Sequence, residues 1–530
     1  MKKVLYIALA IALSAMTATS CSQDLLDIQQ KGAVSMEDFY QTDDDATAAI
    51  AAVYNQVMGF FYDYKFMTNL PSDDVYAGGG QRGDNIQWSY INEFAISSSN
   101  LPSGYYRTPY AIIYRCNLII DKFDPAESSI KARAVAEARF WRAWAHMLLT
   151  IYFGNPPKID YVMDGSERPE NTPASELWPW IISEFDAAAS ALPSKQNVND
   201  KAGGIRVTRE AALAFEGKAQ LYNNDYAGAK TNLKKVIDSG KYDLVPGSEY
   251  MNLWRLAGDL SVEKVLEINV TPNGTNTYPN SMLYLMWGWR ADHVTAMPKI
   301  LYNNSWGFLN PTKEYYDALK AHDGENSIRF KETIKTYDDV VAMDFGTTPD
   351  GKPVEFHVNT PLFGHEGYFD MKYAYYDDGA VKARNGYAYA NNSILMRYAE
   401  VLLMYAEACA KTSDDGSGKA ALNKVQARVN APLTELTLQN VKDEKRFELS
   451  FENERFADLV RWGDAATVYA GKTRQKIPTC AEGWVVEWHD YYGGAVRQKD
   501  YDFTPGKSEH YPYPLSELNV NPNIVQNPGY

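Results

Sequence analysis

The chain has 530 residues, of which 45% are hydrophobic and 22% charged, close to globular averages, so disorder is excluded as its main state. Its 52 basic and 67 acidic residues give a formal net charge of −15. A surface of that sign repels phosphate groups, which excludes nucleic-acid binding. At about 150 residues per domain the length predicts three or four domains, although helical repeat folds exceed that size.

The first twenty residues predict an export signal. Lys2 and Lys3 precede an uninterrupted apolar run over Val4–Leu13, which is shorter than the roughly 20 residues that a bilayer-spanning helix needs. Small residues then lead to Cys21, an arrangement typical of a secretory signal peptide. It is similar to the bacterial lipobox, in which the cysteine is lipidated and becomes the mature N-terminus. We expect residues 1–20 to be a lipoprotein signal peptide; the alternative is a signal peptide beside an incidental cysteine.

Helical patterns follow in the N-terminal part of the chain. Asp43–Asp45 favour the N-terminus of a helix, because carboxylates there interact well with the helix dipole. Asp124–Glu127 have the residue types of a second helix start. Arg209–Tyr222 and Tyr226–Ser239 predict two helices joined by a short polar turn, similar to a tetratricopeptide unit.

The C-terminal part is also predicted to be helical. Apolar residues recur at steps of three and four from Leu395 to Cys409, which predicts one helix, and a Gly-rich turn leads to another from Lys419 to about Val429. Between the helical parts, residues 243–390 are rich in Gly, Pro, Asn and aromatics, with short β-prone pieces such as Val265–Val270. So long a weakly periodic region predicts an irregular, ligand-binding subdomain. The predicted division is therefore a signal peptide (1–20), an N-terminal helical part (21–242), an irregular ligand-binding subdomain (243–390) and a C-terminal helical part (391–530).

Several enzyme and metal motifs are excluded. Gly78, Gly80 and Gly83 match G-x-G-x-x-G in letters only, since acidic residues flank them and no βαβ pattern surrounds them; a turn is predicted instead. The histidines form no zinc motif, and no G-x-S-x-G sequence predicts a serine hydrolase. The remaining three cysteines predict at least one free buried thiol.

The densest charged motif is Asp443–Trp462. Its acidic and basic residues alternate at spacings of three and four, which on a helix places opposite charges side by side. One interpretation makes Arg455 or Arg461 a ligand clamp. The other, which we favour, is an ion-pair network that locks the last helices together.

Several stretches together resemble the SusD/RagB family of Bacteroidetes surface lipoproteins. They run in family order: Ala136–Ala145 with Tyr152–Pro157, Arg206–Thr208, Arg397–Leu403, Leu422–Arg428, Glu448–Trp462 and Gln526–Tyr530. Two departures lie in the charged motif: Lys445-Arg446 stands where an Arg pair is common, and Asn453 where Gly is frequent.

The resemblance implies a mainly α-helical fold of four tetratricopeptide-like helix pairs, with an irregular, loop-rich subdomain that carries short strands and the ligand surface. It also implies a non-catalytic glycan-binding lipoprotein of the outer membrane, facing the cell exterior. Such proteins cap a SusC-like TonB-dependent transporter and deliver oligosaccharides to it.

A glycan offers flat sugar faces edged with hydroxyls, so the complementary surface is a row of exposed aromatic rings beside polar side chains. Four tryptophans in polar, irregular company are the candidate platform: Trp88, Trp287, Trp289 and Trp306. The candidate polar partners are Asp73, Asp74, Asn85 and Arg290. A second, weaker aromatic cluster comprises Trp484, Trp488, Tyr491 and Tyr492.

The Trp-rich set favours a β-linked plant glucan over coiled starch as ligand. No cofactor is predicted; the acidity is compatible with calcium, but no ligand loop is recognisable. Two other functions stay open at this point. One is a surface glycoside hydrolase that uses paired carboxylates. The other is a helical-repeat adaptor that binds only proteins.

Overall fold

The computed structural model describes residues 39–270, 281–377, 391–412, 416–472, 476–490 and 502–530. The predicted signal peptide and Cys21 lie outside these residues. No helix in the described ranges combines the length and the apolar character needed to cross a membrane.

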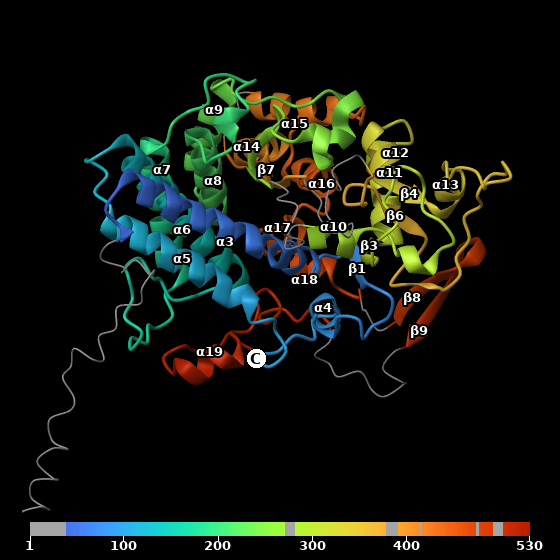
Figure 1. The fold of residues 1–530 in the computed structure, drawn as a ribbon, viewed down its shortest axis with the longest axis horizontal. Helices are drawn as coiled ribbons and strands as arrows, with labels where there is room; N and C mark the ends of the chain where they lie inside the picture. Colours follow the sequence, from blue (N-terminus) through green and yellow to red (C-terminus); the bar gives the residue numbers. More distant parts are fainter. Residues whose placement is uncertain (1–38, 271–280, 378–390, 413–415, 473–475, 491–501) are drawn as a thin grey trace, which may run out of the picture.

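The N-terminal half is helical (Figure 1). Its helices are α3 (Asp43–Asn69), α4 (Ile86–Asn92), α5 (Gly104–Lys122), α6 (Ser129–Phe153), α7 (Ala174–Ala191), α8 (Arg209–Tyr222) and α9 (Tyr226–Asp238). Consecutive helices from α5 to α9 pack on one another, and α3 lies against α5 and α6. Small residues on α8, among them Ala212 and Ala219, are fully buried and permit this close packing.

The C-terminal helices complete the scaffold. They are α14 (Tyr398–Lys411), α15 (Ser417–Arg428), α16 (Leu438–Glu448), α17 (Arg455–Trp462), α18 (Ala465–Val468) and α19 (Leu515–Val520). Helix α14 packs on α9, α15 and α16, so it joins the two helical parts of the chain. The prediction of a mainly α-helical scaffold is confirmed.

The middle of the chain forms shorter elements, on the right of Figure 1. Its helices are α10 (Ser281–Trp287), α11 (Lys313–Asp323), α12 (Ile328–Thr333) and α13 (Tyr337–Val341). The strands in the described residues are β1 (Val75–Gly78), β2 (Lys264–Ile268), β3 (Phe308–Pro311), β4 (Ile334–Thr336), β5 (Leu362–Phe363), β6 (Tyr368–Asp370), β7 (Ser393–Arg397), β8 (Lys476–Ala481) and β9 (Val485–Asp490). They pair antiparallel as β1–β3, β2–β7, β4–β6 and β5–β8–β9.

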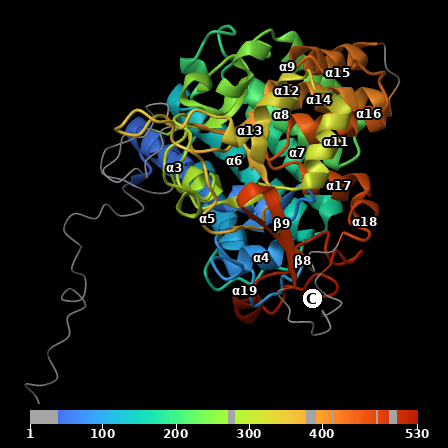
Figure 2. The ribbon, with the colours of Figure 1, turned by 90° about the vertical axis from the view of Figure 1, so that its right-hand side faces the viewer.

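These pairings tie distant segments together. The β1–β3 ribbon joins the end of the first long helix to the middle of the chain, and β8 adds a C-terminal strand to β5. A second apolar cluster contains Trp289, Phe369 and Cys480, so residues from both regions share one small core. In Figure 2 the β8–β9 hairpin faces the viewer. The predicted four-part division of the chain stays a prediction.

Local capping explains several helix ends. Thr42 and Asp45 form a capping box at the start of α3, as the acidic run predicted a helix there. The prediction that α6 starts at Asp124–Glu127 is wrong by a few residues. Ser128 is the N-cap, and its side chain accepts from the Lys131 backbone N–H at 3.1 Å.

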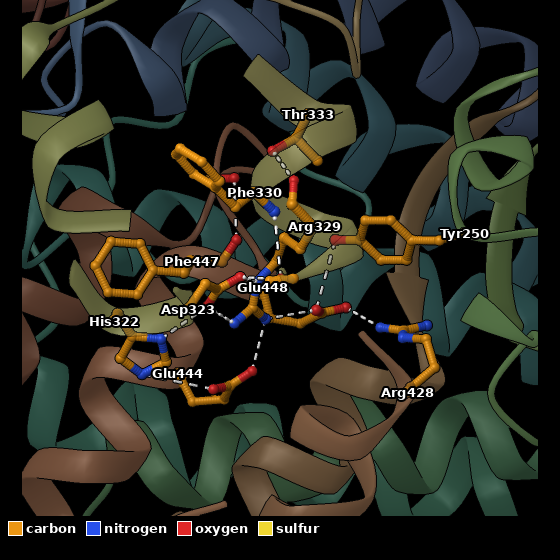
Figure 3. A network of polar contacts seen from close by, with 12 residues as sticks. Tyr250, His322, Asp323, Arg329, Phe330, Thr333, Arg428, Glu444, Phe447 and Glu448 are labelled. Atoms are coloured by element: carbon orange, nitrogen blue, oxygen red, sulfur yellow. Dashed lines mark hydrogen bonds and ion pairs between the residues drawn. The ribbon is translucent and has the colours of Figure 1, made fainter. Parts of the chain in front are cut away.

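A buried ion network connects α11, α12, α15 and α16 (Figure 3). The Arg329 guanidinium, which is fully buried, lies 2.6 Å from Asp323 Oδ1, 2.6 Å from Glu444 Oε1 and 2.8 Å from Glu448 Oε2. Glu448 is also paired with Arg428 and Arg397. Burial by itself raises the pKa of Glu448, but these three guanidinium groups hold that pKa well below its usual range.

The charged motif around Arg455 and Arg461 is structural, as favoured. Arg461 pairs with Glu407 and Asp458, and Arg455 pairs with Asp73 at 2.8 Å. The motif is not one continuous helix: α16 ends at Glu448 and α17 starts at Arg455. Asn453 lies in the intervening turn with φ of 86°, the left-handed conformation that explains why Gly is common there.

Candidate functional site

Three of the four predicted platform tryptophans are buried, so the prediction that they are exposed is wrong. Trp88 is 4% exposed and stacks on Phe66 with ring centroids 3.9 Å apart. Trp287 is 2% exposed and stacks on Tyr373 at 4.2 Å. Rings of this size gain most by leaving water, and apolar neighbours from α3 and the middle region were available to cover them.

Trp289 is also buried, in the second apolar cluster. Its indole N–H donates to the Asp370 carbonyl at 3.0 Å, so its polar atom is satisfied inside the protein. None of these three rings presents a face to a ligand.

Trp306 is the exception, with 39% of its surface exposed. It lies between α10 and β3, in a segment fixed by backbone hydrogen bonds. The Trp306 N–H donates to Leu285 O at 2.8 Å and the Gly307 N–H to Gly288 O at 2.8 Å. The ring is therefore exposed on a rigid frame.

An open cavity of about 590 Å³ lies beside Trp306. Its lining residues are Asp84, Met286, Arg290, Ala291, Asp292, Asn303, Asn304, Ser305, Trp306 and Phe308. The lining thus combines one exposed indole with amide, carboxylate and guanidinium groups. Such a combination suits a neutral ligand that carries both a flat apolar face and hydroxyl groups.

Arg290 was predicted as a polar partner, and the structure places it in this cavity. Its guanidinium lies 3.3 Å from Asp84 Oδ2 and 3.0 Å from Asp292 Oδ2, and it donates to the Trp306 carbonyl at 3.2 Å. The two carboxylates and the carbonyl hold the guanidinium at a fixed position beside the indole.

The glycine-rich turn permits this arrangement. The Gly80 N–H donates to Asp84 Oδ2 at 2.7 Å, and a Cβ at Gly80 would lie 2.8 Å from Arg290 Nη2. The absence of a side chain therefore lets the turn approach Arg290 closely. The predicted turn is confirmed around Gly83, where residues 82–85 turn and the Asp84 N–H donates to Gln81 O at 3.1 Å, whereas Gly78 is the last residue of β1.

Asp73 and Asp74 do not reach the cavity, so their predicted ligand role is corrected. Both are buried: Asp73 pairs with Arg455 at 2.8 Å and Lys472 at 3.1 Å, and Asp74 pairs with Arg446 at 2.6 Å. Burial alone would raise the pKa of Asp73, but the cations around it hold that pKa below its usual range. These ion pairs of Asp73 and Asp74 connect the segment just before β1 to the C-terminal helices.

Asn85 is next to the cavity residue Asp84 but does not line the cavity. It caps α4, where its side-chain oxygen accepts from the Trp88 N–H at 3.3 Å. The polar residues that line the cavity and were not predicted are Asp84, Asp292, Asn303, Asn304 and Ser305. A sequence signal existed, because all five are immediate or near neighbours of a predicted residue: Asn85, Arg290 or Trp306.

The second aromatic cluster is divided. Trp484 is half-buried and donates its indole N–H to Glu366 O at 2.9 Å, whereas Trp488 on β9 is 48% exposed. Tyr491 and Tyr492 lie outside the described residues. Cys116, Cys409 and Cys480 are buried and not joined by disulfides in the described part of the chain, which agrees with the prediction of a buried thiol.

In the described part of the chain, no group of three or more His, Cys, Asp or Glu side chains could hold a metal ion. His146 is buried and satisfied by Arg142 O and the Ile159 N–H, and burial lowers its pKa to about 3. Calcium binding stays an untested prediction.

Comparisons with known proteins give the family. The model of the SusD family matches residues 263–530, half of the chain, and the model described as "starch-binding associating with outer membrane" matches residues 26–221. A SusD-like protein of Bacteroides ovatus is 24% identical over 486 residues, covering 86% of this chain and 82% of the relative. The starch-binding protein SusD of Bacteroides thetaiotaomicron is 26% identical, covering 89% of this chain and 86% of that protein.

A solved structure agrees with this assignment. A laminarin-binding SusD-like protein superposes with a TM-score of 0.75 at 25% identity, covering 93% of this chain and all of the other. The chain therefore belongs to the SusD family.

Proposed function

We propose that the protein captures a neutral polysaccharide or oligosaccharide, without cleaving it, in the cavity beside Trp306. The observation that carries the proposal is the exposed indole held next to Arg290, Asn303 and Asn304 in an open cavity. Relatives named as starch-binding and laminarin-binding support the same ligand class.

The proposal gives each group in the cavity a role. A sugar ring lies flat on the Trp306 indole, which removes apolar surface of both from water. Arg290 donates to sugar hydroxyls, while its position is fixed by Asp84 and Asp292. Asn303 and Asn304 supply both donors and acceptors. Arg290 and the two carboxylates leave one negative charge, which disfavours an anionic glycan.

The remaining parts of the proposal concern the cellular setting. Lipid on Cys21 anchors the chain to the outer membrane, on the exterior side. From there the protein delivers its ligand to a SusC-like TonB-dependent transporter. The family description that names an association with the outer membrane supports this location. A β-linked glucan is the favoured ligand, supported by the laminarin-binding structural relative.

The test is a set of native gels that contain laminarin, barley β-glucan, xyloglucan or amylopectin. We expect the wild-type chain to be retarded by at least one polymer, and Trp306→Ala to weaken that binding about tenfold or more, equivalent to about 1.4 kcal/mol. The melting temperature should barely change, since the ring is already 39% exposed.

Two controls make the result specific. Trp306→Phe keeps an aromatic face and should retain part of the binding, and Leu433→Ala removes another exposed apolar side chain, from outside the cavity lining, and should retain all of it. New reducing ends released from the polymer would instead show a glycoside hydrolase. A chain that no glycan retards would favour a protein-binding adaptor.

A further inference from the structure

The second exposed indole of the molecule is Trp488. All tryptophans of the chain lie within the described residues, and of these Trp306 and Trp488 are the two that are exposed, at 39% and 48%. The others are buried or half-buried. Trp488 does not line the cavity beside Trp306, so that site leaves its exposure unexplained.

The fold places the two rings near opposite ends of one short ribbon. Trp488 on β9 contacts the ring of Tyr76 edge-on, with centroids 6.5 Å apart. Tyr76 belongs to β1 and pairs across the ribbon with Asn310 of β3, whose strand begins two residues after Trp306. The Tyr76–Asn310 pair therefore stands between the two rings: Tyr76 contacts Trp488, and Asn310 is four residues along the chain from Trp306.

Polar groups accompany Trp488 on its face of β9. Asp490 is two residues away and therefore lies on the same face, and Lys476 of β8 is directly opposite Asp490. One carboxylate acceptor and one ammonium donor thus lie together on one side of the indole. This combination of a flat ring with hydroxyl-binding groups repeats the chemistry of the Trp306 cavity.

The hairpin is poorly suited to binding a partner's β-strand. In the three-stranded sheet β9 is the outer strand, and it carries Glu487 and Asp490, both exposed. Charged residues on a short outer strand discourage pairing with another chain. A carbohydrate does not need to pair with the backbone of the strand, because it contacts the ring face and its hydroxyls pair with the charged groups.

We propose that Trp488 is a second sugar-binding subsite, which holds a distal part of a long glycan while the Trp306 cavity holds another. This inference rests on the proposed function. Two weak subsites on one ligand strengthen each other through effective concentration. A short oligosaccharide reaches only one of them, so chain length distinguishes the two sites.

The experiment is titration calorimetry of Trp488→Ala with laminarin, or with whichever polymer of the panel retards the wild type, and with a trisaccharide of the same linkage. We expect polymer affinity to fall about fivefold or more, since the gain from linking the two subsites is lost. Trisaccharide affinity should stay unchanged. Trp306→Ala should lower the affinity for both the polymer and the trisaccharide.

Val485→Ala is the matched control. Val485 lies on the same strand, is 52% exposed, and faces the opposite side from Trp488. The variant protein should bind both ligands with the affinity of the wild type. Unchanged polymer affinity in a folded Trp488→Ala protein, with Trp306→Ala still defective, overturns the second subsite and leaves the proposed function standing. Loss of transporter co-purification alone would assign Trp488 to a protein interface and also overturn it.

Discussion

At the scale of single residues, Asn453 shows how a departure from a family pattern is accommodated. Its φ of 86° is a conformation that non-glycine residues adopt at a cost. Its side-chain oxygen accepts from Thr68 Oγ1 at 2.9 Å and from Asn69 Nδ2 at 3.1 Å, both on α3. Asparagine tolerates this backbone better than other side chains and here adds two buried hydrogen bonds.

We expect Asn453→Ala to lower the free energy of unfolding by about 2 kcal/mol, because the backbone strain remains while Thr68 and Asn69 each lose one of their buried hydrogen-bond acceptors. Urea unfolding followed by fluorescence measures the change. Asn430→Ala is the control: Asn430 is also left-handed, with φ of 59°, but exposed. A loss at Asn430 as large as that at Asn453 would show that the hydrogen bonds contribute little.

At the scale of elements, sequence patterns located helices well where local signals were complete. The predicted helix Arg209–Tyr222 has the same bounds as α8, whose N-cap is Thr208. The predicted helix Tyr226–Ser239 matches α9 within one residue, and its N-cap is Asp225. The apolar stripe that started at Leu395 was overextended. Leu395 lies in β7, and pairing with β2 overrides the helical spacing there.

The buried network around Arg329 links four helices, so breaking it should be costly. Arg329→Met leaves Asp323, Glu444 and Glu448 without this cation, and we expect a loss of about 3–5 kcal/mol, measured by urea unfolding. Lys419→Met breaks an exposed pair with Glu435 and should cost about 0–1 kcal/mol. Equal losses in the two variants would refute a structural role for the network.

At the scale of the whole molecule, the C-terminal residues close both regions of the fold. Helix α14 joins the helical halves, β8 extends the sheet of the middle region, and Asp73, two residues before β1, pairs with Arg455 of α17. Arg397, the last residue of β7, forms buried ion pairs with Glu263, which precedes β2, and with Glu448 of α16. The scaffold is thus held by charges from distant segments, which makes it sensitive to acid.

We expect the melting temperature to fall steeply between about pH 4 and pH 2. Burial opposes ionisation of Asp323, but Arg329 lowers its pKa to about 2, whereas an unfolded Asp titrates near 3.9. In this range the unfolded chain binds more protons than the native one, so the free energy of unfolding decreases as the pH is lowered. Melting curves from pH 7 to pH 2.5 test this, and Arg329→Met should show a shallower decline below pH 4. An equally steep decline in the variant would contradict the assignment.

The sequence by itself determined the family resemblance, the helical scaffold, the structural role of the charged motif and the region that holds the cavity, because these depend on local spacing and on motifs that recur in order. It identified Trp306 and Arg290 but placed Trp88, Trp287 and Trp289 with them, since polar neighbours in sequence do not determine exposure. Only tertiary packing decided which indoles were covered, by Phe66, Tyr373 and the second apolar cluster. Burial depends on partners that are distant in sequence, so the same local pattern yields a buried core ring in one place and an exposed ring in another.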